Sequence, residues 1–242
     1  KYRRKEDAME KNFDYIVVGA GSAGCVMANR LSQDGENSVL VLEAGGKDKN
    51  FFIHMPSGYS QIVPTKNDVN YGFETEPEST TNNRKLYWPR GRGWGGSSSI
   101  NAMVYIRGHA HDYDLWRQMG NEGWSYENVL PYFKKLESWS GGENLYRGGS
   151  GPLKVNRSKI DNAFPLAKSL INAAAEAGYD TFEDWNGFKE DGFGTFDVTI
   201  DNGRRQGVSR AYLNEIKGYK NLKIEHNTDV SKIIFNEKKQ LV

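Results

Sequence analysis

The sequence lacks paired cysteines, a net charge of either sign and long apolar runs, and each absence excludes a class of protein. Cys25 is the single cysteine among 242 residues, so no disulfide can form within the chain. One thiol is consistent with a reducing compartment, and we expect a cytoplasmic location. The 32 basic and 31 acidic residues leave a formal net charge of +1. This balance gives no electrostatic reason to expect a nucleic-acid partner.

No apolar run approaches the roughly 20 residues that span a bilayer. Peripheral attachment, for example to the inner membrane, stays open. Residues 1–10 are mostly charged and hold no apolar signal core, so an N-terminal secretion signal is not expected here. Met9 is interpreted as a natural start, and residues 1–8 as tag, linker or upstream sequence.

A strand–helix–strand unit is expected near the N-terminus. Residues 13–18 and 38–42 are short, apolar and rich in β-branched side chains, which predicts two buried strands. Residues 25–31 predict the helix between them, and the crossover must be right-handed. Further helices are expected at 112–117, 125–137 and 164–177, and further strands at 222–224 and 230–235. These elements are too few to cover both faces of a parallel sheet, so the chain is interpreted as truncated at its C-terminus.

A glycine motif fills the turn between the first strand and the helix. Gly19 allows a tight turn, Gly21 lets the main chain approach a diphosphate, and Gly24 lets helix and strand pack closely. Glu43 ends the second strand, where a carboxylate can accept hydrogen bonds from ribose hydroxyls and would repel a 2′-phosphate. The motif predicts a site for an adenine dinucleotide. A turn that binds nothing and an NAD-dependent dehydrogenase are the alternatives.

A second glycine-rich run lies at residues 90–104. Gly95 and Gly96 admit close approach of the main chain, and the following serines can donate to phosphate oxygens. As composition alone, a surface loop explains the run equally well. Cys25 is interpreted as a packed side chain, and His109 and His111 as surface residues or indirect supports rather than metal ligands.

The wider pattern resembles the glucose–methanol–choline (GMC) oxidoreductase family. The matching segments are Asp14–Gly24, Leu42–Gly46 and the run Gly91-Arg92-x-Trp94-Gly95-Gly96-Ser97-Ser98-x-Ile100-Asn101, followed by Tyr105, Gly108 and Asp114. Within the family the sequence is most similar to bacterial choline dehydrogenases. That likeness is carried by Glu74–Glu78, Asn82–Arg84, Tyr105–Gly108, Gly142–Tyr146, Asn186-Gly187, Gly203–Arg205 and Arg210–Leu213.

The resemblance implies an α/β fold: an FAD-binding Rossmann-like domain of GMC type with part of an α+β substrate domain. Residues 9–154 would form the first part of the FAD-binding domain with lid segments. Residues 155–205 would belong to a partial substrate-binding domain, and residues 206–242 would return to the FAD-binding domain. Some members attach the flavin covalently through a histidine in the segment occupied here by Ser99-Ile100. Ile100 offers no nucleophile, so we expect non-covalent FAD.

The resemblance also assigns roles to residues at matching positions. The ADP half of FAD would be held by Gly19, Gly21, Ser22, Gly24, Glu43 and Ala44. The pyrophosphate and ribityl chain would be lined by Arg90, Gly95, Gly96 and Ser97. The isoalloxazine would lie beside Asn101, Ala102, Met103 and Val104, and the adenine beside the main chain of Val230. The histidines are His54, His109, His111 and His226, and none occupies the family's catalytic motif, so no catalytic residue is assigned to this chain.

The implied activity is oxidation of a primary alcohol to an aldehyde by hydride transfer to flavin N5, with choline to betaine aldehyde as the expected case. A quinone or an electron-transfer chain is the expected acceptor, and oxygen is the alternative. Aliphatic or aromatic alcohols are the alternative substrates. A non-catalytic nucleotide-binding fragment is the alternative to an enzyme.

Overall fold

The computed structural model describes residues 12–158, 161, 163–188 and 191–235. The chain divides into two compact units, each built from separated stretches. The first unit comprises the residues up to Lys49, Thr65–Ser99 and the residues from Val208 onward. The second unit comprises Asn50–Pro64 and Ile100–Gly207. The expected residues 1–8 of tag or linker lie outside the described part of the chain.

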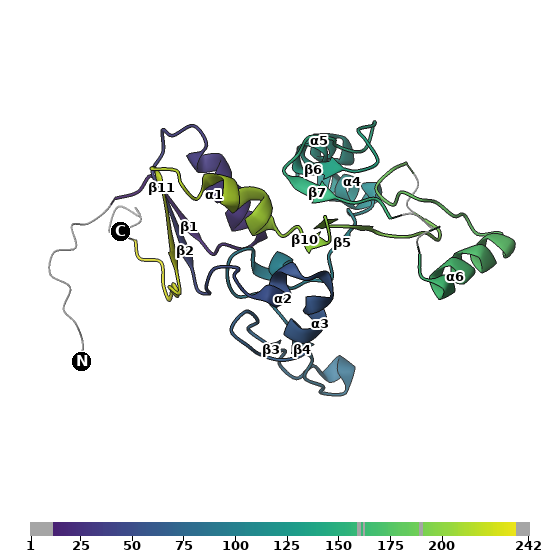
Figure 1. The fold of residues 1–242 in the computed structure, drawn as a ribbon, viewed down its shortest axis with the longest axis horizontal. Coiled ribbons are helices and arrows are strands. Elements are labelled where there is room, and N and C mark those ends of the chain that lie inside the picture. The colour runs from purple at the N-terminus through teal and green to yellow at the C-terminus, as the bar shows by residue number, and fades with distance from the viewer. Residues whose placement is uncertain (1–11, 159–160, 162, 189–190, 236–242) are drawn as a thin grey trace. The chain divides into compact units, whose positions relative to one another are not determined.

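A three-stranded parallel sheet forms the centre of the first unit (Figure 1). Its strands are β1 (Tyr15–Val18), β2 (Val39–Glu43) and β11 (Leu222–His226), and β2 lies between the other two. Helix α1 (Ser22–Ser32) connects β1 to β2, which confirms the predicted strand–helix–strand unit. The same unit also contains the shorter elements β3 (Phe73–Glu74), η2 (Ser79–Thr81), β4 (Tyr87–Trp88), η3 (Gly96–Ser99), the π-helix η5 (Ser209–Leu213) and α7 (Asn214–Ile216).

Burial within this sheet differs between its strands. Val39 and Val41 of β2 are fully buried, as the sequence predicts. The prediction of a buried first strand is wrong, because Tyr15, Ile16 and Val18 are 43%, 41% and 54% exposed. The reason is position: among the described residues, β1 is an outer strand that pairs with β2 on one side only.

The strand predicted at 230–235 is also wrong. After β11 the chain turns at Asn227, whose φ is 56°, and the amides of Asn227 and Thr228 bond to the carbonyls of Gly45 and Glu43. Residues 230–234 then have no regular secondary structure. β-branched side chains favour a strand only where a partner strand and a surface to pack on are present.

The second unit combines short strands with three longer helices. Helices α4 (Ala110–Gln118), α5 (Tyr126–Leu136) and α6 (Pro165–Glu176) lie at the predicted positions. Ser125 caps α5 by accepting from the amide of Asn128. The other elements are α2 (Phe51–His54), η1 (Pro56–Gly58), α3 (Tyr59–Ile62), β5 (Val104–Tyr105), β6 (Glu137–Trp139), β7 (Leu153–Val155), β8 (Asp197–Val198), β9 (Ile200–Asp201) and β10 (Arg204–Arg205).

A buried ionic cluster joins the loops of this second unit. The Arg147 guanidinium donates from Nε to Glu137 Oε1 at 2.9 Å and from Nη1 to Asp197 Oδ2 at 2.8 Å, and it also binds Asp184. Arg107 adds a second bond to Glu137 at 2.8 Å. Burial raises the pKa of Asp197, although its bonds to Arg147 oppose that shift. Each guanidinium of the cluster is paired with carboxylates of the same cluster, which is the pattern of a structural core rather than of a binding site.

The units do not follow the segments expected from the resemblance. Residues 100–154, expected with the FAD-binding domain, belong to the same compact unit as residues 155–207. The two compact units do not show which segments hold a cofactor. The functional division into 9–154, 155–205 and 206–242 therefore stays a prediction.

Candidate functional site: two glycine loops and a carboxylate

The first glycine loop runs from the end of β1 into α1. Gly21 is the N-cap residue of α1, and no side chain caps this helix end. No acidic residue lies in the first turn either. The amides of Ser22, Ala23 and Gly24 therefore begin the helix without an acceptor from a capping side chain, and the helix dipole adds a partial positive charge. This end of α1 can receive an anion.

Gly24 and Cys25 explain why the start of α1 lies so close to the loop. A Cβ on Gly24 would overlap the carbonyl oxygen of Gly19, so helix and loop can approach this closely only at glycine. Cys25 is fully buried and its thiol contacts the carbonyl oxygen of Ala20 at 3.1 Å. Burial raises the pKa of this thiol to about 12. Cys25 is thus a packed side chain, as predicted.

The Glu43 carboxylate holds three main-chain segments together. Its Oε2 accepts from the amide of Ala20 at 2.7 Å, and its Oε1 accepts from the amides of Gly45 and Gly93 at 2.8 and 2.9 Å. The residue is 6% exposed. An ionised carboxylate has about four acceptor positions, so Oε2 keeps one lone pair for a further donor. The sequence places Glu43 at the strand end but does not reveal its three amide partners.

The second glycine loop lies directly against the first. The amide of Gly95 donates to the carbonyl of Ala20 at 2.7 Å, and the amide of Trp94 donates to Gly46 at 3.0 Å. Gly96 has a φ of 52°, and a Cβ there would come within 2.8 Å of the Gly21 Cα atom. The two loops can touch in this way only because Gly96 lacks a side chain. The structure therefore brings the two predicted motifs together, and the surface-loop alternative for residues 95–96 is wrong.

The space beside the first loop suits a diphosphate. A Cβ built on Gly19 or on Gly21 would meet no atom within 4 Å. Open space therefore borders the bare main chain where α1 begins, which is the arrangement that lets phosphate oxygens reach amide groups. The residues present thus fit the phosphate groups of a dinucleotide cofactor.

The other predicted residues of the first unit occupy varied environments. Arg92 donates to the carbonyl of Ala44 at 3.0 Å, and Ser97 Oγ accepts from the amide of Gly91 at 3.1 Å, which leaves its own hydroxyl proton able to donate. The Arg90 guanidinium is exposed and lies 5.1 Å from the ring centroid of Trp88. Val230 is 37% exposed. The cofactor roles of these residues stay predictions.

Ser98 behaves differently from the sequence interpretation, which made it a phosphate donor. Its hydroxyl donates to the carbonyl of Gly95 at 2.6 Å and accepts from the amide of Val208 at 3.0 Å. A hydroxyl has one proton, so in this structure the Ser98 proton is engaged within the loop. Ser98 thus links the second glycine loop to the segment that enters η5.

The predicted flavin-side residues Asn101, Ala102, Met103 and Val104 belong to the second unit. Met103 is buried, whereas Asn101, Ala102 and Val104 are exposed. Arg205, which the sequence interpretation left without a role, donates from Nη1 to both oxygens of Asn101, at 2.7 and 2.8 Å. Arg204 and Arg205 look alike in sequence, and only the fold shows that Arg205 is the buried one.

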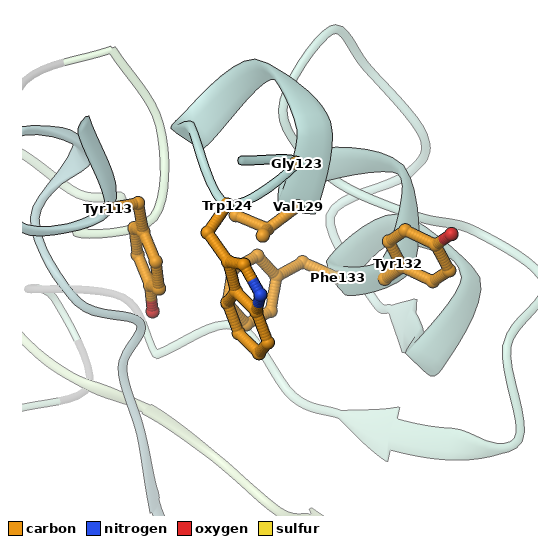
Figure 2. A pocket seen from close by; sticks show the side chains of 6 residues that line it. All are labelled: Tyr113, Gly123, Trp124, Val129, Tyr132 and Phe133. Carbon is orange, nitrogen blue, oxygen red and sulfur yellow. The ribbon is translucent and has the colours of Figure 1, made fainter. Parts of the chain in front are cut away.

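The second unit also contains an apolar cavity of about 470 Å³ between α4 and α5. Figure 2 shows the rings of Tyr113, Trp124 and Phe133 gathered at it, with the Tyr132 hydroxyl pointing away. Aromatic rings can recognise a quaternary ammonium group, but such a cage is strongest with a carboxylate nearby. The lining residues Tyr113, Gly123, Trp124, Val129, Tyr132 and Phe133 include no carboxylate, so the cavity does not identify a substrate.

His109 and His111 lie at the start of α4. His109 caps α4, where its Nδ1 accepts from the amide of His111 at 3.0 Å and Asp112 completes a capping box. Within the described part of the chain, no cluster of histidine, cysteine, aspartate or glutamate could hold a metal ion. In the same part of the chain, no helix has both the length and the apolar character needed to cross a membrane.

Comparison with known proteins gives results that agree with this geometry. The family model described as GMC oxidoreductase matches residues 13–242. The chain is 46% identical over 231 residues to the oxygen-dependent choline dehydrogenase of Vibrio vulnificus, covering 96% of this chain and 41% of that protein. It is 48% identical to the mitochondrial choline dehydrogenase of Mus musculus, covering 92% of this chain and 38% of that protein.

A solved structure shows the same fold. An FAD-dependent oxidoreductase from Chaetomium thermophilum matches with a TM-score of 0.84 and 32% sequence identity, covering 94% of this chain and 40% of that one. The chain thus spans about two fifths of the length of the curated relatives it matches.

Proposed function

Because this chain belongs to the GMC oxidoreductase family, we propose that the full-length protein is an FAD-dependent alcohol dehydrogenase that binds its cofactor against the two glycine loops. The contact between these loops, through the amide of Gly95 and the carbonyl of Ala20, supports this proposal most directly. It joins a dinucleotide-binding turn to a second loop that an NAD-dependent dehydrogenase would leave without a role.

The first unit supplies the groups that would hold the ADP half. The amides at the start of α1, from Ser22 to Gly24, face the diphosphate, and Gly19 and Gly21 leave it room. The Oε2 atom of Glu43 accepts a ribose hydroxyl with its remaining lone pair. The remaining assigned positions are Ala44 and Val230 toward the adenosine, Arg90, Gly95, Gly96 and Ser97 toward the pyrophosphate and ribityl chain, and Asn101, Ala102, Met103 and Val104 toward the isoalloxazine.

Bound FAD supplies a hydride acceptor, and the protein supplies orientation and electrostatics. Ile100 is buried and offers no nucleophile, which supports non-covalent attachment. None of the four histidines here lies in the catalytic motif implied by the family. We therefore place the group that accepts the alcohol proton outside this sequence.

The relatives favour choline as the substrate, oxidised to betaine aldehyde. Both curated relatives reported above carry choline dehydrogenase in their names. The decisive assay follows choline oxidation by the full-length protein with an artificial electron acceptor. Oxidation of aliphatic or aromatic alcohols but not of choline would contradict the substrate assignment. Absence of any alcohol oxidation by flavin-loaded protein would favour a non-catalytic nucleotide-binding protein.

A quinone or an electron-transfer chain is proposed as the electron acceptor, which also fits peripheral attachment to a membrane. Oxygen is the second candidate, because the name of the Vibrio vulnificus relative includes it. Oxygen uptake during choline turnover, measured with and without added quinone, separates the two. Uptake that matches choline consumption in the absence of quinone would favour oxygen.

The cofactor site itself is tested by Gly21→Ala in the full-length protein. In the cofactor-free protein the new methyl group meets nothing within 4 Å, so the melting temperature should not change. The methyl group occupies the proposed diphosphate space, so we expect FAD affinity to fall at least about tenfold, the effect of roughly 1.4 kcal/mol. Gly218→Ala is the matched control, because a Cβ there also meets nothing. Equal FAD affinity in the two variants would contradict the proposed site.

A further inference from the structure

Met103 has a main-chain conformation that its side chain disfavours. Its φ is 63°, and the other non-glycine residues with positive φ in the described part of the chain are all asparagines. Asparagine tolerates this left-handed region, whereas methionine rarely adopts it. Met103 is also 3% exposed, so the strained residue is buried. Such strain persists only where surrounding contacts impose it.

Hydrogen bonds with two residues, Asn101 and Thr199, hold Met103 directly. Its amide donates to Oδ1 of Asn101 at 3.1 Å, and its carbonyl accepts from the amide of Thr199 at 2.8 Å. The first bond closes a short turn through the Asn101 side chain, so the conformation of Met103 depends on where that side chain amide points. The exposed Asn101 side chain needs a fixed partner to keep this orientation.

Arg205 provides that partner. Its Nη1 donates to the main-chain oxygen of Asn101 at 2.7 Å and to Oδ1 at 2.8 Å, while its Nε donates to the carbonyl of Ile53 at 2.7 Å. The residue is 2% exposed, and burial lowers its pKa to about 10, so the guanidinium remains charged at neutral pH. The guanidinium is therefore fixed by the bond from Nε to Ile53, and its Nη1 holds the Asn101 turn through two hydrogen bonds.

We propose that Arg205 is a positioning residue that fixes the Asn101–Met103 turn in the strained shape it presents to the flavin. The part of this role that concerns the flavin rests on the proposed function, which places the turn beside the isoalloxazine. The planar guanidinium suits the task because its N–H groups point in fixed directions to several acceptors. A lysine ammonium at the same position is a point charge on a flexible stem. It cannot bind the carbonyl of Ile53 and both oxygens of Asn101 in the same geometry.

The test compares Arg205→Lys with Arg204→Lys in the full-length protein loaded with FAD. Arg204 is the preceding residue of β10 and is exposed, so the control makes the same chemical change outside the buried turn. We expect Arg205→Lys to alter the visible circular dichroism of bound flavin, to shift its midpoint potential and to weaken FAD binding about tenfold. Arg204→Lys should leave all three unchanged.

Asn101→Ala disrupts the same turn by removing the side chain that Arg205 binds. This test does not depend on whether a variant of the buried Arg205 folds. We expect it to reproduce the spectral change and potential shift of Arg205→Lys, and the double variant to go no further than either single one. If Asn101→Ala and Arg205→Lys both keep the wild-type spectrum and potential, the inference is wrong. Fully additive effects would also overturn it, because they would mean that the residues act separately.

Hydrogen exchange of the Met103 amide gives a readout that needs no flavin. Loss of the turn should speed exchange at Met103 in Arg205→Lys and leave it unchanged in Arg204→Lys. If the wild-type protein binds no FAD, the proposed function fails, and this exchange rate alone decides the role of Arg205. Equal exchange in the two variants would overturn it.

Discussion

The region around Glu43 and the region around Arg147 both use one buried charge to hold several segments, but their partners differ. Glu43 accepts from the main-chain amides of Ala20, Gly45 and Gly93, whereas Arg147 donates to the side-chain carboxylates of three acidic residues. Main-chain amides carry only partial charges, so the Glu43 carboxylate keeps acceptor capacity for a ligand. The carboxylates around Arg147 neutralise it. The type of partner thus distinguishes the region proposed to bind the cofactor from the region that holds loops together.

The largest expected effect comes from Arg147→Met. Removing the guanidinium leaves the buried Asp197 carboxylate without its guanidinium partner and leaves Glu137 with Arg107 alone, which costs about 3–5 kcal/mol of unfolding free energy. Denaturant unfolding measures this loss. Lys168→Met is the control, since its ion pair with Asp161 is exposed and contributes less than about 1 kcal/mol. Equal losses in the two variants would contradict the structural role of the cluster.

Glu43→Gln should have a smaller effect on stability but an additional effect on binding. Glutamine keeps one acceptor oxygen and turns an N–H₂ group toward main-chain donors, so we expect a loss of about 1–3 kcal/mol in the cofactor-free protein. FAD affinity should fall further still. Glu36→Gln, at an exposed turn, makes the same chemical change as a control. A variant that loses FAD affinity at unchanged cofactor-free stability would show that Glu43 contacts only the ligand.

The third prediction concerns the pH dependence of stability in the region around Arg147. Burial raises the pKa of Asp197 above its ordinary 3.8. A carboxyl with a raised pKa stabilises the fold in its protonated form, so this contribution is full below the unfolded pKa and is lost as pH rises through the folded value. Asp197→Asn, which mimics the protonated state, should remove that slope. Melting temperatures recorded from acid to neutral pH measure it, and identical slopes in variant and wild type would contradict the assignment.

The smallest effect is a labelling rate at Cys25, which lies beside the Glu43 region. The buried thiol, with its pKa raised to about 12, should react very slowly with a thiol reagent at neutral pH. Glu43→Gln loosens the loop that contains Ala20, so labelling of Cys25 should accelerate. Arg147→Met should leave the rate unchanged under conditions where the variant stays folded. Acceleration by both substitutions would show that the two regions do not open independently.

The sequence predicts the elements whose pattern is local. The β1–α1–β2 unit and the three longer helices follow from short-range periodicity, and each glycine of the first loop lies where the motif requires it. The contact between the Gly19–Gly24 loop and Gly95 also follows, because both loops were expected at one cofactor.

Long-range packing accounts for what the sequence did not predict. The exposure of β1 depends on which strands flank it, and the failed strand at 230–235 depends on the lack of a pairing partner among the described residues. The buried cluster around Arg147 joins residues from separate loops, and no spacing along the chain indicates it. The burial of Arg205 cannot be predicted from the sequence either, because its neighbour Arg204 has an identical side chain and is exposed.

The first unit is built from stretches that lie far apart in the sequence, and this affects how the chain folds during synthesis. The hydrogen bond from Asn29 to the carbonyl of Tyr212 joins positions 183 residues apart. Strand β2 is separated from its partner β11 by the same length of chain, so β2 is synthesised long before β11 can pair with it. At ribosomal rates of about 5–20 residues per second, that wait is roughly ten to forty seconds. During it, the open edge of β2 is exposed to other nascent chains. Expression at lower temperature or with added chaperones should therefore raise the yield of native protein.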